Sequence, residues 1–105
     1  MATFKNAVFR DITTNPQTLY TSTSDSTIIL SLLVANTDGT LTQDVTIAQK
    51  DGVTLEAYLA STITVPANSN VDLISNKYIL PAGKSIEVSA SANNSLDLTV
   101  SIVEV

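Results

Sequence analysis

The tripeptide Gly83-Lys84-Ser85, within "LPAGKSIEV", comes nearest of all residues in the chain to a known chemistry. It matches the end of a P-loop, where backbone amides and a helix N-terminus cradle phosphate. A complete P-loop needs a glycine five residues before Gly83, and that position is Tyr78. The residues after Ser85 alternate as in a strand. We therefore predict a turn, with Lys84 a solvated charge beside it, and no phosphate site.

Acidic residues suggest two further chemistries, a calcium site and a pair of catalytic carboxylates. Asp38, Asp44 and Asp51 are six or seven residues apart, whereas a calcium loop places its acids at alternate positions. We interpret them as turn-capping residues, and a cation held between loops is the alternative. Glu56 and Glu87 each lie among small polar residues and are expected on solvated strand faces.

The chain contains neither histidine nor cysteine. The commonest general base, the commonest metal ligand and the thiolate ligands are therefore missing, and the serines have no partner for a hydrolytic triad. A serine–lysine pair that uses Lys84 is the remaining catalytic alternative. We predict a protein that is not an enzyme, with no catalytic residues, no metal and no cofactor.

Charge and hydropathy restrict the partners. The 105 residues carry a net charge of −5, and the five basic residues are scattered, which argues against direct binding of nucleic acid. The longest apolar run, "IILSLLVA", is interrupted by Ser31 and is too short to span a membrane. The N-terminal residues lack the apolar stretch of a secretory signal, so synthesis in a cytoplasm is expected. Few residues are charged and many are Ser, Thr or Asn, which suits a surface packed against other subunits.

Apolar and polar residues alternate along most of the chain, which is typical of antiparallel strands with one buried face. Turn dipeptides such as Asp38-Gly39 and Asp51-Gly52 separate the alternating runs. We predict one all-β domain over residues 1–105, an antiparallel β-sandwich of jelly-roll or immunoglobulin-like type with about eight short strands. Residues 1–16 either pack as a strand or extend as an arm. The predicted strands are 4–12, 18–22, 27–36, 43–50, 53–65, 70–74, 85–92 and 95–104.

Two predicted strands carry the candidate interface residues. In "TIILSLLVANT", Ile29 and Leu33 compete for the buried face with the alternating set that contains Ile28. Ile29 and Leu33 are left over, either for a second layer of the same domain or for a neighbouring subunit. In the strand 53–65, Tyr58 falls on the polar face and is the best single contact residue. The buried face of that strand is expected to hold Val53, Leu55, Ala57, Leu59, Ile63 and Val65.

The segments "VPANSNVDL" and "LPAGKSIEV" begin 15 residues apart and share a pattern. Each has an apolar residue, Pro-Ala, a few small or polar residues and then an alternating strand. Because proline cannot donate a hydrogen bond to a ladder, each Pro marks the end of a strand. We predict two similar corners of one sandwich, with Val71 and Ile86 restarting the buried face.

The order of these motifs resembles a family of small acidic virion proteins of tailed bacteriophages, of the marine and cyanobacterial type. The resemblance rests on "MATFKNAVFRDITTNPQTLYT", "LLVANTDGT", "VTIAQKDGVT", the block holding both Pro-Ala corners, and the closing "LTVSIVEV". It implies a β-sandwich located in the virion, made in the host cytoplasm and bound to the major capsid protein or other virion proteins. It favours a head decoration or cement protein present in many copies, as a homo-oligomer and preferably a trimer.

Two other functions stay open. One is a neck, tail or fibre-adaptor subunit of the same virion. The other is a carbohydrate-binding or adhesion module that uses Tyr58 and the polar face of its strand.

Overall fold

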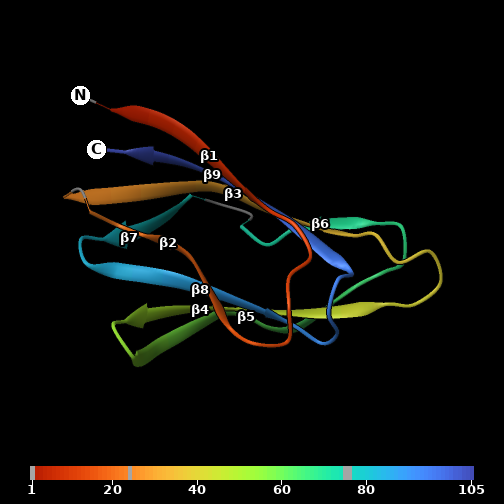
Figure 1. Ribbon diagram of the computed structural model, residues 1–105. Helices are drawn as coiled ribbons and strands as arrows, with labels where there is room; N and C mark the ends of the chain where they lie inside the picture. Colours follow the sequence, from red (N-terminus) through yellow and green to blue (C-terminus); the bar gives the residue numbers. More distant parts are fainter. Residues whose placement is uncertain (1, 24, 75–76) are drawn as a thin grey trace.

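The computed structural model describes residues 2–23, 25–74 and 77–105, and these form nine strands in two layers without a helix (Figure 1). The strands are β1 (Thr3–Phe9), β2 (Gln17–Thr21), β3 (Ser26–Asn36), β4 (Gln43–Asp51), β5 (Thr54–Val65), β6 (Asn70–Asp72), β7 (Tyr78–Pro81), β8 (Lys84–Ala90) and β9 (Leu96–Glu104). The predicted all-β sandwich is confirmed. The structure adds β7, a four-residue strand that the alternation pattern did not reveal.

The strand order is that of a jelly roll. One sheet, sheet A, has the order β1-β9-β3-β6, with β7 also paired to β3, and the other, sheet B, has the order β2-β8-β4-β5. All strand pairs are antiparallel. The chain crosses between the sheets at every connection except β4–β5 and β6–β7, as expected for two interlocked Greek keys.

The core lies between the two sheets and is almost wholly aliphatic. Strand β9 shows how the sequence makes it: its alternate residues Leu96, Leu98, Val100 and Ile102 are buried, as alternation predicts. Each such side chain contributes about 1.5–3 kcal/mol by leaving water. Of the predicted segment 1–16, residues 3–9 pack as a strand, because β1 pairs with β9 over seven consecutive residues.

Strand β5 differs from the prediction. Of the six residues expected to be buried, only Val65 is buried, and Val53, Leu55 and Ile63 are exposed. The register between β4 and β5 shifts three times, and each shift places an extra residue on β5. Since side chains alternate with period two, every extra residue reverses the faces that follow it. Simple alternation is therefore the wrong rule for this edge strand.

Both Pro-Ala segments are corners between the sheets, as predicted. Pro66 follows the last residue of β5, and Pro81 ends β7. In both corners the second residue after proline has a left-handed backbone, with φ of 55° at Asn68 and 82° at Gly83. Asparagine and glycine are the residues that tolerate this conformation best. Lys84 begins strand β8 rather than a helix, so the structure offers no P-loop here.

Candidate interaction surface

An apolar row crosses the outer face of sheet A. In the strand register, Phe4 lies opposite Val103, Val103 opposite Ile28, and Ile28 opposite Ile79. Directly opposed residues share a face, so these four side chains from β1, β9, β3 and β7 form one continuous line. Phe4 is 73% exposed and Ile79 is 65% exposed. The four residues are called the apolar row below.

The sheet around the apolar row carries neutral side chains. Asn6 and Ser101 lie opposite one another in the next outward-facing position, and Val8, Thr99 and Leu33 follow in register beyond them. Alternate residues of each strand face outward, so from the apolar row to Thr99 the outer face of β1, β9 and β3 consists of aliphatic, hydroxyl and amide groups, and the charge of Asp72 follows only on β6, opposite Leu33. The part of the face on β1, β9 and β3 can be desolvated without burying a charge.

The structure corrects one predicted interface residue, Ile29. It is fully buried in the core, whereas its neighbour Ile28 faces outward in the apolar row. The cause is a bulge in β3: Ile29 pairs with Ile102 and Ser31 with Ser101, so Leu30 is an extra residue. The bulge reverses the alternation within the strand. Leu33 lies beyond the bulge, faces outward and is 38% exposed.

The third predicted interface residue, Tyr58, lies on the surface of β5 and is 57% exposed. It lies between two open pockets, of about 350 and 240 Å³. The larger pocket is lined by Ala57, Tyr58, Leu59, Leu73, Ile74, Lys77 and Tyr78. An aromatic side chain with a polar tip, set beside a hollow of mixed polar and apolar lining, suits contact with a partner or a sugar ring.

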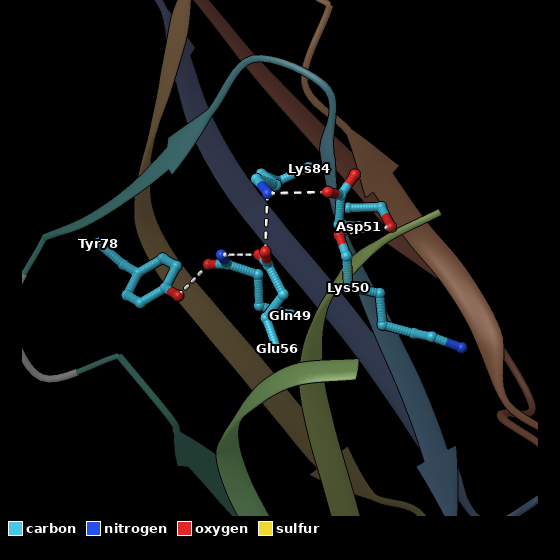
Figure 2. A network of polar contacts seen from close by, with 7 residues as sticks. Gln49, Lys50, Asp51, Glu56, Tyr78 and Lys84 are labelled. Carbon is cyan, nitrogen blue, oxygen red and sulfur yellow. Dashed lines mark hydrogen bonds and ion pairs between the residues drawn. The ribbon is translucent and has the colours of Figure 1, made fainter. Parts of the chain in front are cut away.

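Lys84 is an ion-paired residue rather than the solvated charge predicted from the sequence. Its ammonium nitrogen lies 2.7 Å from a carboxylate oxygen of Glu56 and 3.2 Å from one of Asp51 (Figure 2). The amide of Gln49 donates to the other Glu56 oxygen at 2.9 Å, and the Tyr78 hydroxyl donates to the Gln49 carbonyl. Because Tyr78 is on β7 and the other four are on β4, β5 and β8, the network joins the two sheets.

The ion pairs shift the titration of these groups. The hydrogen bond from Lys84, followed by that from Gln49, lowers the pKa of Glu56 below its usual value. The same pairing with Glu56 and then with Asp51 raises the pKa of Lys84. Burial raises the pKa of Tyr78. Glu87 pairs with Lys50 at 3.3 Å, so the two glutamates are engaged by different lysines.

A second polar cluster closes the opposite side of the sandwich, where β1, β2 and β9 meet. The Tyr20 hydroxyl donates to Glu104, and Lys5 lies 2.9 Å from the other oxygen of that carboxylate. These two contacts, with Tyr20 first, lower the pKa of Glu104. Lys5 therefore has its charge matched within its own chain.

The aspartates proposed as an alternative cation site are engaged in turns and pairs. One Asp38 oxygen accepts the backbone N–H groups of Thr40 and Leu41, at 2.9 and 3.0 Å. Asp44 accepts the Thr64 hydroxyl. Among the described residues, no group of three or more acidic residues is placed to hold a metal ion. No helix in the same part of the chain is long and apolar enough to cross a membrane.

The apolar row is the feature that sequence analysis missed. Its members come from four strands, and Phe4 and Val103 are almost a chain length apart. No local pattern reports which strands are neighbours or in what register they pair. The one available signal was that Phe4 and Val8, with Asn6 between them, fall on the face of residues 3–9 opposite Lys5, Ala7 and Phe9.

Comparisons with known proteins identify the fold. No family model matches the sequence, and no curated protein matches it. A chain of the Bacillus endospore appendages, described as disulfide-linked pili, has a TM-score of 0.59 at 14% identity, over 98% of this chain and 87% of that one. A chain of the T13 IBDV viral particle has a TM-score of 0.57 at 7% identity, over 97% of this chain and 30% of that one. A pentameric capsid protein from metagenomic phage sequences has a TM-score of 0.46 at 17% identity, over 94% and 59% of the two chains. At such identities the first two show a shared β-sandwich fold.

Proposed function

We propose that this chain is a virion structural protein that binds in many copies to the head shell as a decoration protein. The observation that carries the proposal is the apolar row on the outer face of sheet A. It offers two strongly exposed aliphatic or aromatic side chains, Phe4 and Ile79, with no charge between them. Burial of that row against the major capsid protein removes apolar area from water without the cost of desolvating a charge.

Two further observations support a virion role. A domain of the same fold occurs in a chain of the T13 IBDV viral particle. The order of motifs along the sequence also resembles that of phage virion proteins. In this role the domain does no chemistry: it bridges neighbouring capsid subunits and holds the shell against internal pressure. Binding in many copies stabilises both partners by mass action.

Quantitative mass spectrometry of the particle that contains this chain tests the proposal. A decoration protein is expected at a copy number close to that of the major capsid protein. A handful of copies in each particle would instead place the chain in the neck, tail or fibre adaptor.

The likeness to a pilus chain supports that second structural candidate, a fibre or adaptor subunit. The pili are described as disulfide-linked, and this chain has no cysteine. A fibre of this chain would therefore be held without disulfides. Labelling in the intact particle separates the two, since a fibre subunit is found on the tail and a decoration protein over the head.

A carbohydrate-binding function is favoured by Tyr58 and the pocket beside it. Glycan-array binding that is lost in Tyr58→Ala, with the fold unchanged, would support this function. The matched control is Tyr20→Phe, which changes a tyrosine away from both pockets and retains the ring.

A further inference from the structure

The edges of the two sheets differ in how well they could accept another strand. Native proteins protect exposed edges with bulges, proline, charge or short length. Among the described strands, β5 carries three register shifts and β2 carries one. Strands β6 and β7 are three and four residues long, and β7 ends in Pro81. Strand β1 has the fewest of these protections: it pairs with β9 over seven residues without a shift, contains no proline, and carries a single charged residue, Lys5.

We propose that β1 pairs with β1 of a second copy of this chain, antiparallel and about a two-fold axis at Asn6. The two copies of sheet A then form one continuous sheet across the axis. This contact does not depend on a virion role, and it replaces the trimer favoured by the family resemblance as the first contact between copies.

The side chains of β1 select this register. A continuous sheet keeps outward residues opposite outward residues, which allows an axis at Lys5, Asn6 or Ala7. An axis at Lys5 would place two like charges directly opposite one another. An axis at Ala7 would set Asn6 opposite Val8, a polar residue against an apolar one. An axis at Asn6 pairs all seven residues, with Phe4 opposite Val8 of the second copy on both sides of an amide pair.

The charges of the chain favour the same contact. The chain carries a net charge of −5, so most of its surface repels a second copy. Residues 2–10 contain no acidic residue. The one charge within β1, Lys5, is paired with Glu104 of its own chain and lies opposite Ala7 of the second copy in this register. Within the paired residues 3–9 the edge can therefore approach its own copy without an uncompensated charge, and Arg10 lies one residue beyond the contact.

The pairing also covers the exposed end of the apolar row. Phe4 is the end of that row, and in the dimer it has Val8 of the second copy beside it. Val8 is in line with Thr99 and Leu33 of its own chain, so each row meets an apolar residue of the other copy without joining the other row. Seven paired residues make a small interface, of the kind that gives weak association unless further contacts add to it.

Cysteine cross-linking tests the contact directly, because the chain has no cysteine of its own. At a two-fold axis the two copies of residue 6 have Cα atoms about 4.5–5.5 Å apart, which is within reach of a disulfide. Asn6→Cys is expected to form a disulfide-linked dimer under mild oxidation. Asn70→Cys, which changes an exposed asparagine in the edge strand β6, is the matched control and is expected to remain monomeric. Equal cross-linking of the two variants would overturn the proposal.

Charge exchange at the axis provides an independent test in solution. The unmodified chain is expected to show a monomer–dimer equilibrium by sedimentation over roughly 10 µM to 1 mM. Asn6→Asp and Asn6→Lys each place like charges opposite one another and should weaken the dimer roughly tenfold, while an equimolar mixture of the two restores it. Asn70→Asp should leave the equilibrium unchanged. A monomer at all concentrations, a trimer, or no recovery in the mixture would contradict β1 pairing. None of these results bears on the copy number in the particle, so the proposed function is tested separately.

Discussion

Ile28 and Ile29 are adjacent residues of the same type with opposite environments. Ile29 is buried among the core residues, and Ile28 faces outward beside Ile79. Ile29→Ala is expected to lower the free energy of unfolding by about 3 kcal/mol, because it leaves a cavity in a packed core. Ile28→Ala should cost less than about 1 kcal/mol. Urea denaturation of both variants measures the difference. Equal losses in the free energy of unfolding would show that β3 has no bulge at Leu30.

Glu56 is expected to make the stability of the fold depend on pH. Its pKa is lowered in the folded protein by Lys84 and Gln49, so its pairing stabilises the fold fully above the pKa of the unfolded chain. That contribution is lost as the pH falls below this value and through the lower pKa of the folded state. Between about pH 5 and pH 3, the urea midpoint of the unmodified chain should fall more steeply than that of Glu56→Gln.

The urea midpoint of Glu56→Gln should still fall somewhat as the pH is lowered, because the pKa values of Asp38 and Glu104 are lowered too. The comparison is made at low ionic strength, since these partly exposed pairs are screened by salt. Parallel curves for the two proteins would show that the Glu56 pairing contributes nothing to folding.

The two Pro-Ala corners share one backbone requirement, a left-handed residue two positions after the proline. Asn68 and Gly83 hold the equivalent left-handed position, and nothing lies within 4 Å of a Cβ added at Gly83. Any cost of substitution there is therefore conformational rather than steric. Gly83→Asn should change the free energy of unfolding by less than about 1 kcal/mol, and Gly83→Val should cost about 2 kcal/mol. Thermal and urea unfolding measure both, and a tolerated valine would contradict a left-handed corner.

The bulge in β3 is a second element whose role can be isolated. Deletion of Leu30 removes the extra residue and leaves the two halves of the strand facing as they do now. Deletion of Leu32, which is buried, reverses the faces of everything on one side of it. The Leu30 deletion should fold cooperatively with a loss of about 1–3 kcal/mol, whereas the Leu32 deletion should not fold. Near-UV spectra and unfolding curves distinguish the two deletions. A Leu32 deletion more stable than the Leu30 deletion would show that the bulge lies elsewhere in β3.

The regular elements were predictable because local rules govern them. Strands such as β8 and β9 follow alternation, and both corners follow the chemistry of proline and of left-handed residues. The buried faces of β5 and of the middle of β3 were predicted incorrectly, because a bulge depends on the partner strand. The local sequence does not identify that partner. Of the predicted contact residues, Leu33 and Tyr58 lie on the surface, and their contacts with a partner stay a prediction. The prediction for Ile29 was wrong because the bulge at Leu30 reverses the alternation from which the buried face of β3 was predicted.

At the scale of the molecule, the two sheets differ in where their charges lie. The ion pairs of Lys50 and Lys84 connect strands of sheet B, whose edge strand β5 also exposes Leu55, Tyr58 and Ile63, while the outer face of sheet A carries the apolar row without an ion pair across it. In the proposed function, the outer face of sheet A is the one that meets the partner. A substitution on the outer face of sheet A should for this reason affect binding and leave folding intact.

Ile79→Lys isolates that face. Ile79 is an exposed member of the apolar row and lies on β7, on the far side of the sheet from β1, so the change leaves pairing between copies undisturbed. It should alter the free energy of unfolding by less than about 0.5 kcal/mol, because the side chain is already in water. Binding to particles that lack the chain should fall at least tenfold, since a lysine buried at the contact would be unpaired. Val53→Lys, which makes the same kind of change at an exposed hairpin tip, is the matched control and should bind normally. Retained binding by Ile79→Lys, measured by co-sedimentation with the particles, would show that the chain attaches through another surface.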